Sequence, residues 1–146
     1  MWLEALRMLL TSFVGSLGFA IILQAPRRSL LTSAFIGSLG YLCYWGIVRT
    51  GGSEWLAMFC GALVGSLLAQ VAARREHRVA TIFVTIAIIP LVPGLGLYRS
   101  MQFLAQGMSS QGARLGVQTM MSFLMLALGV TVGSFVCRAV FRRREG

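Results

Sequence analysis

Charged residues divide this sequence into five intervals of nearly constant length that contain no charge. The intervals lie at residues 8–26, 29–48, 55–73, 79–98 and 115–137, and they contain 19, 20, 19, 20 and 23 residues. A helix that crosses the hydrocarbon core of a bilayer needs about 20 predominantly apolar residues. Five such intervals in 146 residues leave no room for a separate soluble domain. We therefore expect a single all-α membrane domain covering residues 1–146.

The composition agrees with a membrane-embedded chain. Hydrophobic residues make up 57% and charged residues 12% of the sequence, whereas a soluble domain carries about 25% charged residues. The net charge of +9 raises nucleic-acid binding as an alternative. All thirteen basic residues are arginines at the edges of apolar intervals, however, rather than along one polar face. They therefore indicate membrane topology and headgroup anchoring.

The distribution of arginine predicts the orientation of the spans, which we place at residues 6–23, 30–48, 55–73, 79–98 and 115–137. Arginine is disfavoured in short translocated loops. Counted on alternating sides, one group is Arg7, Arg49, Arg99 and Arg114, and the other is Arg27, Arg28, Arg74, Arg75, Arg78, Arg138, Arg142, Arg143 and Arg144. The larger group predicts an N-terminus outside and a C-terminus in the cytoplasm of a bacterial inner membrane. This holds if the fourth segment crosses rather than re-enters.

Two features of the chain ends and cysteines complete this topology. The first ten residues carry one glutamate and one arginine rather than a positive cluster, so we expect the first span to be retained rather than cleaved as a signal peptide. The three cysteines, Cys43, Cys60 and Cys137, lie inside apolar spans and are odd in number. A disulfide framework is therefore not expected.

Small residues recur every four positions in three of the spans. In lipid, helices associate through close backbone packing, so such a stripe indicates a helix–helix contact. The stripes consist of Ser12, Ser16 and Ala20, of Ala57, Gly61, Gly65 and Ala69, and of Gly129 and Gly133. The sequence leaves open whether these stripes meet within the chain or contact another subunit.

The fourth interval differs because two prolines and two glycines interrupt it. A helix from Val79 can continue only to about Pro90, and twelve residues rise about 18 Å, less than the hydrocarbon core of about 30 Å. Pro90 and Pro93 each remove a backbone donor and disfavour helix at the preceding residue. We therefore expect a break or sharp kink at membrane depth. The polar residues 100–113 then predict a short interfacial helix followed by a loop.

Such a break is a candidate solute site. Irregular backbone at membrane depth is tolerated where it is buried in protein or lines a wet cavity, and in transporters it lies at the substrate site. If Pro93 opens a new helix, free N–H groups at residues 94–96 form an anion site. Arg99 adds a guanidinium suited to carboxylates, and Tyr98 adds a hydroxyl. The predicted substrate-binding residues are Pro90, Pro93, Gly94, Leu95, Gly96, Tyr98 and Arg99.

The same residues have a purely structural interpretation. Prolines kink many transmembrane helices without any role in function, and Tyr98 with Arg99 is also typical of an interfacial anchor pair.

Residues 89–101, Ile-Pro-Leu-Val-Pro-Gly-Leu-Gly-Leu-Tyr-Arg-Ser-Met, resemble the Pro-Gly-x-x-x-Tyr segment of the threonine/serine exporter family, in its small-subunit or C-terminal-half form. The layout of nearly the whole chain is also similar. It has a short N-terminus, an Ala-Pro-Arg turn after the first span, Gly-Ser-Leu-Gly early in the second, and Gly-Ser-Glu-Trp before the third.

This resemblance implies one half of an exporter whose other half is a separate polypeptide, and hydroxy amino acids or small carboxylates as solutes. The motif match carries over to Pro90, Pro93, Gly94 and Tyr98 only. The predicted role of Arg99 rests on the physical argument alone.

Several residue types are missing from the spans. Proton-coupled transporters usually place acidic residues or histidine within the membrane, but here the four glutamates and the single histidine lie at span edges or in loops: Glu4, Glu54, Glu76, Glu145 and His77. Ion coupling would have to come from a partner or from an edge group such as Glu54. The chain also lacks a metal-ligating cluster, a Ser-His pairing in the membrane and a phosphate-binding loop. We therefore expect no enzyme, no catalytic residue, no metal and no cofactor.

Two functions remain. The first is a subunit of a secondary-type exporter of small amino acids, such as threonine and serine, or of small carboxylates. Its partner would be a second membrane subunit of a split exporter, further copies of the chain, or both. The alternative is a non-transporting membrane scaffold that assembles a larger complex through the small-residue stripes.

Overall fold

The structure is a computed structural model that describes residues 2–77 and 79–142. The described residues form helices joined by short turns, without any β-strand. The elements in chain order are α1 (Trp2–Ile22), α2 (Arg27–Arg49), α3 (Glu54–Arg75), α4 (Ala80–Ile88), the 3₁₀ helix η1 (Ile89–Leu91), α5 (Gly94–Ala105) and α6 (Ser109–Arg142). Arg78, Arg143 and Arg144, which the sequence assigns to the cytoplasmic side, lie outside the described residues.

Four of these helices have the length and hydropathy of membrane spans, at Leu3–Ile22, Ser29–Arg49, Glu54–Arg75 and Ser109–Val140. Ala80–Leu91 and Gly94–Ala105 meet the same criteria only as a pair, and the pair is bent by 50°. The described part of the chain therefore has four candidate spans, or five if the bent pair crosses as one. The predicted all-α membrane fold is confirmed.

Helix α3 lies at the centre of the packing. Helices α2 and α4 pack against it, α6 packs along another of its sides, and α1 packs against α2. The short helix α4 is held in a hydrophobic cluster in which buried Phe83 and Ala87 contact Ile36 of α2 and Ala69 of α3. This cluster places the end of α4, and hence the break that follows, in the interior of the helix assembly.

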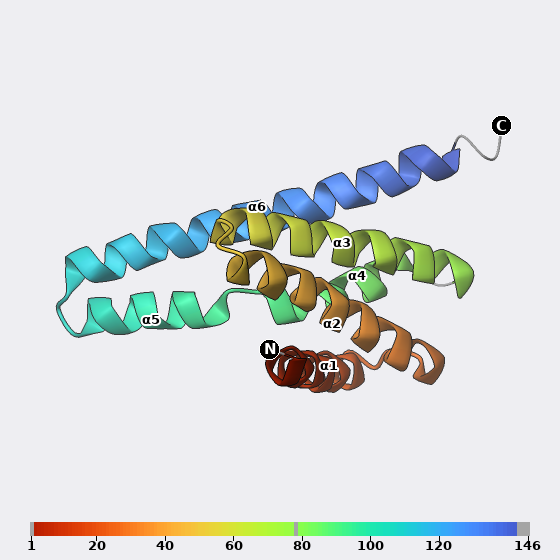
Figure 1. The fold of residues 1–146 in the computed structure, drawn as a ribbon, viewed down its shortest axis with the longest axis horizontal. Coiled ribbons are helices and arrows are strands. Elements are labelled where there is room, and N and C mark those ends of the chain that lie inside the picture. The colour runs from red at the N-terminus through yellow and green to blue at the C-terminus, as the bar shows by residue number, and fades with distance from the viewer. Residues whose placement is uncertain (1, 78, 143–146) are drawn as a thin grey trace.

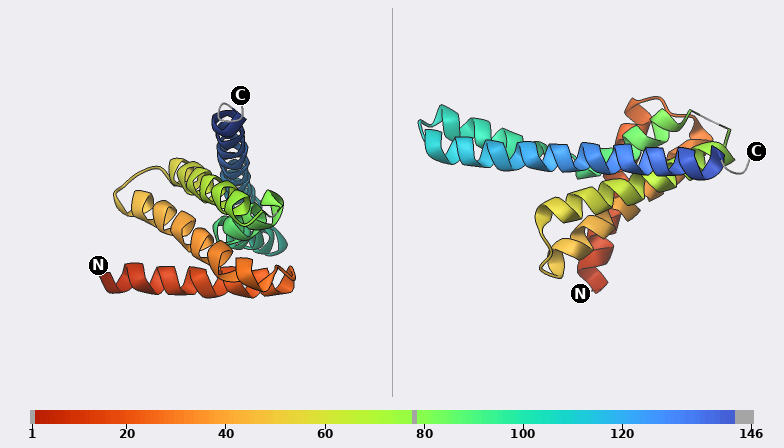
Figure 2. Two further views of the ribbon diagram at one scale, coloured as in Figure 1. Left: turned by 90° about the vertical axis from the view of Figure 1, so that its right-hand side faces the viewer. Right: turned by 90° about the horizontal axis from the view of Figure 1, so that it is seen from above.

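The second half of the bent pair leaves this assembly. Helix α5 runs antiparallel to the first half of α6, and together they form a hairpin that projects past the ends of α2 and α3 (Figure 1). Figure 2 shows that α1 lies crosswise to α6. The bent pair itself begins beside the end of α3 and finishes at the far tip of the hairpin (Figure 1).

Glycine at a left-handed position ends both α2 and α5. Gly51 has φ +83° and Gly107 has φ +79°. In each turn the glycine N–H and the next N–H bond back to carbonyls of the last helical turn, for example Gly52 to Ile47 at 3.0 Å and Met108 to Phe103 at 2.9 Å. This pattern is the Schellman motif, in which glycine avoids the strain of a side chain at positive φ.

The loop predicted within residues 100–113 is a short turn in the structure. Helix α5 continues to Ala105 and α6 already begins at Ser109. Gly112 belongs to this stretch but lies inside α6, where a Cβ atom would lie 2.7 Å from Leu104. Glycine there permits close approach of two helices, which sequence composition alone does not distinguish from a loop.

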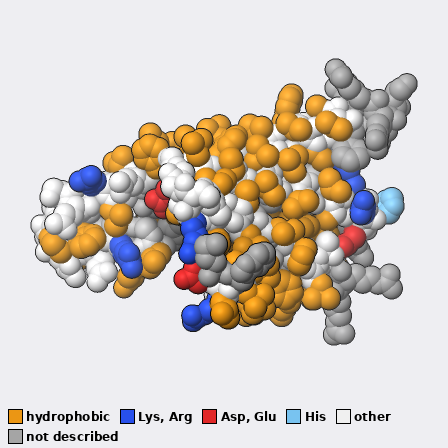
Figure 3. Space-filling model, viewed as in Figure 1, with side chains coloured by type: hydrophobic (Ala, Val, Ile, Leu, Met, Phe, Trp, Pro, Cys, Tyr) orange, Lys and Arg blue, Asp and Glu red, His pale blue; other side chains and the backbone are white. Residues whose placement is uncertain are grey.

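The surface agrees with a membrane location. Hydrophobic side chains cover the middle of the molecule, and charged side chains gather in zones on either side of them (Figure 3). At one such zone, Arg49 at the end of α2 forms an ion pair with Glu4 of α1 and lies over the ring of Trp45 at 5.0 Å. Charges at both edges of a hydrophobic belt are typical of a chain that spans a bilayer.

Candidate functional site

The break between α4 and α5 is built by its two prolines. Pro90 lies in the first turn of η1, where its missing N–H costs no hydrogen bond. Val92, which precedes Pro93, is extended with ψ 120°, as expected for a residue before proline. Pro93 itself has φ −78° and ψ 53°, close to the central residue of an inverse γ-turn. The chain thus changes direction over Ile89–Pro93 and then starts a new helix.

The new helix leaves two backbone donors without an acceptor. Its first internal bond runs from the Leu97 N–H to the Pro93 carbonyl at 3.4 Å. Among the described residues, the N–H groups of Leu95 and Gly96 have no acceptor. The predicted third donor, Gly94, is not free, because the γ-turn at Pro93 directs the Gly94 N–H onto the Val92 carbonyl at 2.8 Å.

A cavity of about 430 Å³ opens beside this break. That volume lies in the range of small-molecule sites, about 300–1,000 Å³. The cavity lies where the α5–α6 hairpin diverges from α2 and α3, and its lining comes from five parts of the chain. The lining residues are Tyr41 and Tyr44 of α2, Glu54 and Met58 of α3, Pro90–Pro93 of the break, Leu95, Gly96 and Arg99 of α5, and Leu115, Gln118, Thr119 and Ser122 of α6.

Two opposite charges line this cavity. Glu54 comes from the start of α3 and Arg99 from the second turn of α5. Within the described residues they form no ion pair with each other, since the ion pair found there joins Arg49 to Glu4. The Tyr44 hydroxyl donates to the Glu54 carboxylate at 3.4 Å. Both charges thus remain available to a bound solute.

Helix α6 contributes a polar stripe to the same cavity. Gln118, Thr119 and Ser122 lie on one helical face, at positions i, i+1 and i+4. The hydroxyls of Thr119 and Ser122 donate to carbonyls one turn back, at 2.8 and 3.2 Å. Because a hydroxyl oxygen also accepts hydrogen bonds, both side chains can still receive one from a solute.

Close packing of α5 on α6 holds the cavity wall in place. A Cβ atom on Gly96 would lie 2.6 Å from the Thr119 hydroxyl oxygen, so only glycine allows this approach. One turn further along, the buried Ser100 hydroxyl donates to the Gly112 carbonyl at 2.7 Å. These contacts fix Arg99 and the two free N–H groups relative to the polar stripe of α6.

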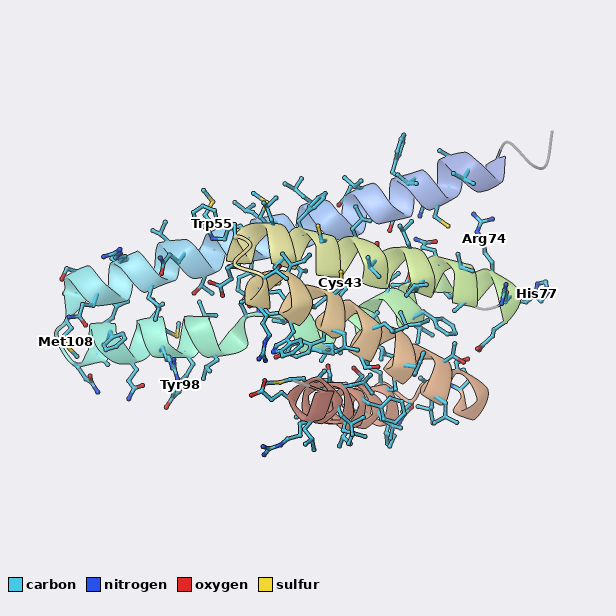
Figure 4. All side chains as sticks on the ribbon, in the orientation of Figure 1. Cys43, Trp55, Arg74, His77, Tyr98 and Met108 are labelled. Carbon is cyan, nitrogen blue, oxygen red and sulfur yellow. The ribbon has the colours of Figure 1, made fainter. Side chains whose placement is uncertain are left out.

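The structure brings together most of the predicted substrate-binding residues. Pro90, Pro93, Leu95, Gly96 and Arg99 line the cavity, whereas Gly94 and Tyr98 do not. Tyr98 is 64% exposed and points away from the other helices (Figure 4). Its exposure agrees with the interfacial-anchor alternative rather than with a contact to solute in this cavity.

Other cavity residues were not predicted from the sequence. Tyr41 and Tyr44 follow an apolar run at the end of the second span, where aromatic side chains are also typical of the membrane interface, and Glu54 was considered only as an edge group for ion coupling. The spacing of Gln118, Thr119 and Ser122 within an apolar span was the available signal, because polar residues on one face of a membrane helix usually face the protein interior.

The small-residue stripes pack within the chain, but against different partners. On α3, a Cβ atom at Gly61 would lie 2.9 Å from the Gly40 carbonyl of α2, and one at Gly65 would lie 3.9 Å from Ala87 of α4. All four stripe residues of α3, Ala57, Gly61, Gly65 and Ala69, are buried.

The glycines of α6 contact another face of α3. A Cβ atom at Gly129 would lie 2.5 Å from the Phe59 carbonyl, and one at Gly133 would collide with the Ser66 hydroxyl. The stripes of α3 and α6 therefore do not meet each other, and α3 is held on two sides by close backbone contacts.

Comparison with known families agrees with this architecture. The family model described as "Threonine/Serine exporter, ThrE" matches residues 8–136, which include the break and every residue that lines the cavity. The chain belongs to the threonine/serine exporter family. The predicted family is thereby confirmed, and the chain is a membrane transport protein rather than an enzyme. No solved structure matches the chain.

Proposed function

We propose that this member of the threonine/serine exporter family is a subunit of a secondary-type exporter whose solute passes through the cavity at the break. The observation that carries the proposal is the pair of opposite charges, Glu54 and Arg99. They line one cavity from different helices without pairing. Both side chains are exposed, and two opposite charges left unpaired in one cavity can bind the two charged ends of a small zwitterionic solute.

The charges favour a small amino acid over a dicarboxylate as solute. The solute carboxylate binds Arg99 and the free N–H groups of Leu95 and Gly96 at the positive end of α5. The solute ammonium binds Glu54, which Tyr44 orients. The hydroxyl of threonine or serine accepts from or donates to Gln118, Thr119 or Ser122. A dicarboxylate would satisfy Arg99 but would meet repulsion from Glu54.

The subunit role and the orientation belong to the same proposal. The bent pair begins beside α3 and finishes at the far tip of the hairpin (Figure 1), and we propose that it crosses the membrane as one span. With five crossings, the larger group of arginines favours a C-terminus in the cytoplasm of a bacterial inner membrane and an N-terminus outside. The hairpin exposes large apolar side chains, including Leu95, Met101 and Met120. We propose that a second membrane subunit of a split exporter, or further copies of the chain, cover them.

The test is an export assay in cells that lack their own threonine exporters and that produce the chain together with a candidate second membrane subunit of the same exporter family. We expect efflux of threonine and serine. Arg99→Gln should reduce it about tenfold or more, since it removes a charge-assisted contact. Glu54→Gln should reduce amino-acid efflux but not dicarboxylate efflux.

Arg114→Gln is the matched control, because Arg114 is an exposed arginine of the same hairpin that does not line the cavity. Its efflux should equal that of the wild type. Equal efflux in all three variants, at equal protein levels, would contradict the proposal. No efflux by any form, together with loss of the partner protein from the membrane when the chain is deleted, would favour the scaffold instead.

A further inference from the structure

A second cavity of about 300 Å³ lies on the other side of the break, between α1 and η1. Its lining includes Ser12, Gly15 and Phe19 of α1, with Tyr41 and Pro90. Its volume matches the lower end of small-molecule sites. Nothing in the family assignment or in the proposed path through the first cavity accounts for it.

Tyr41 and Pro90 line both cavities. They therefore form a common wall between the charged cavity and the cavity at α1. Pro90 is part of the break, in the 3₁₀ helix η1. Tyr41 belongs to α2, and its ring contacts the ring of Tyr44, with centroids 5.9 Å apart. Tyr44 in turn donates to Glu54. The wall is thus linked by direct contacts to one of the two charges of the first cavity.

The side chain is the part of this wall that can move. Next to Tyr41, a Cβ atom on Gly40 would lie 3.2 Å from the Gly61 carbonyl of α3. Such close backbone contact holds α2 against α3, because packed interiors deform little. Rotation of the Tyr41 ring about its side-chain bonds is then the smallest change that joins the two cavities.

A buried, unsatisfied hydroxyl borders the second cavity. Ser12 lines this cavity and is 8% exposed, and its buried Oγ atom, like that of Ser16 one turn further along α1, has no hydrogen-bond partner among the described residues. Buried hydroxyls are nearly always hydrogen-bonded, so each exception calls for an explanation. A solute that passes along this cavity would supply the missing partner after one rotation of the serine side chain.

We propose that the cavity at α1 is a second site for the same small polar solute, in series with the charged cavity, and that Tyr41 is the gate between them. This inference rests on the proposed function. It adds a residue that controls passage and a binding site that the break itself does not contain. The competing occupant is a lipid acyl chain, which would fill an apolar groove without any water.

Cysteine reactivity separates the two occupants. Gly15→Cys places a thiol in the second cavity, with no atom within 4 Å of the new Cβ. Val14→Cys is the matched control, because Val14 is adjacent on α1, 67% exposed and outside the cavity. Whole cells producing the chain and its partner are treated with a charged methanethiosulfonate, and modification of each position is read by mass spectrometry. The native cysteines can therefore remain.

We expect Gly15→Cys to react with the charged reagent about tenfold faster than Val14→Cys, because a thiol in water ionises more readily than one in lipid. Excess threonine should slow the reaction. Thr11 lines the same cavity. Thr11→Cys should therefore react as fast as Gly15→Cys and should also be protected by threonine. Reaction of both cavity positions only with a lipid-soluble maleimide, at the rate of Val14→Cys, would overturn the proposal. Threonine export would then persist, so the proposed function would stand.

The gate has its own variant. Tyr41→Ala removes the common wall and should raise the reactivity of Gly15→Cys severalfold. Threonine should then pass through the protein in both directions, so that cells no longer maintain a threonine gradient across the membrane. Tyr41→Phe keeps the ring and should behave as the wild type. Unchanged reactivity and unchanged export in Tyr41→Ala would exclude Tyr41 as the gate.

Discussion

Gly94 and Gly96 stand two residues apart at the start of α5, and their surroundings differ. A Cβ atom on Gly94 would meet no atom within 4 Å, whereas one on Gly96 would lie 2.6 Å from the Thr119 hydroxyl. There is room for a side chain at Gly94, whereas Gly96 must be glycine for α5 to contact α6 this closely. The sequence could not separate them, because the distance depends on a residue 23 positions away.

Gly96→Ala should therefore push α5 away from α6 and impair export, at a cost in stability of about 1–3 kcal/mol typical of overpacking. Gly94→Ala, the matched control, should retain export and stability. The double variant Gly96→Ala with Thr119→Ala should recover part of both, since it removes the colliding hydroxyl. Thermal unfolding in detergent and threonine efflux measure these effects, and equal behaviour of the two single variants would contradict this contact.

The sequence predicts those features of the site that depend only on neighbouring residues in the chain. Pro90 and Pro93 dictate the break, and Arg99 follows it within reach of the cavity. The presence of Arg99 and Glu54 in the same cavity was not predictable, because it depends on how α3 and α5 are placed relative to each other. Local sequence likewise could not show that Pro93 turns the Gly94 N–H inward onto Val92.

Among the elements, α3 has the most constrained surroundings. Its glycine stripe contacts α2 and α4, and another face accommodates the glycines of α6. The four-residue spacing predicts that such contacts exist, because small residues allow helix backbones to approach in lipid. The spacing does not predict which helix each stripe contacts, because a small-residue face can pack against any other helix of the chain or of another subunit.

Gly129→Ala tests the α3–α6 contact. The new Cβ would lie 2.5 Å from the Phe59 carbonyl, a backbone atom that cannot rotate away, so we expect a loss of about 1–3 kcal/mol in stability. Gly18→Ala on α1, where nothing lies within 4 Å, should instead be neutral or gain up to about 1 kcal/mol from helix propensity. Urea or thermal unfolding in detergent compares them. A loss as large in Gly18→Ala would show that glycine is needed for another reason.

At the scale of the whole molecule, a helix assembly and a projecting hairpin meet at the broken segment (Figure 2). The charged cavity is lined by residues of the assembly, the break and the hairpin. The five charge-free intervals predicted where helices run, because the bilayer fixes their length. The projecting hairpin was not predicted, because the sequence placed a loop before the last span. In the structure, α6 begins at Ser109, six residues before the apolar interval, and these residues lengthen the hairpin. Polar residues there extend a helix that hydropathy alone would have ended.

The central claim is that solute occupies the cavity at the break, and solute protection of a single thiol tests it most directly. Ser122→Cys places a thiol in the cavity, whereas Met121→Cys, the adjacent position, lies outside it. During threonine export, both are treated with a charged methanethiosulfonate. We predict that saturating threonine slows modification at Ser122→Cys and leaves Met121→Cys unchanged. Equal modification of Ser122→Cys with and without threonine, while export continues, would contradict the account.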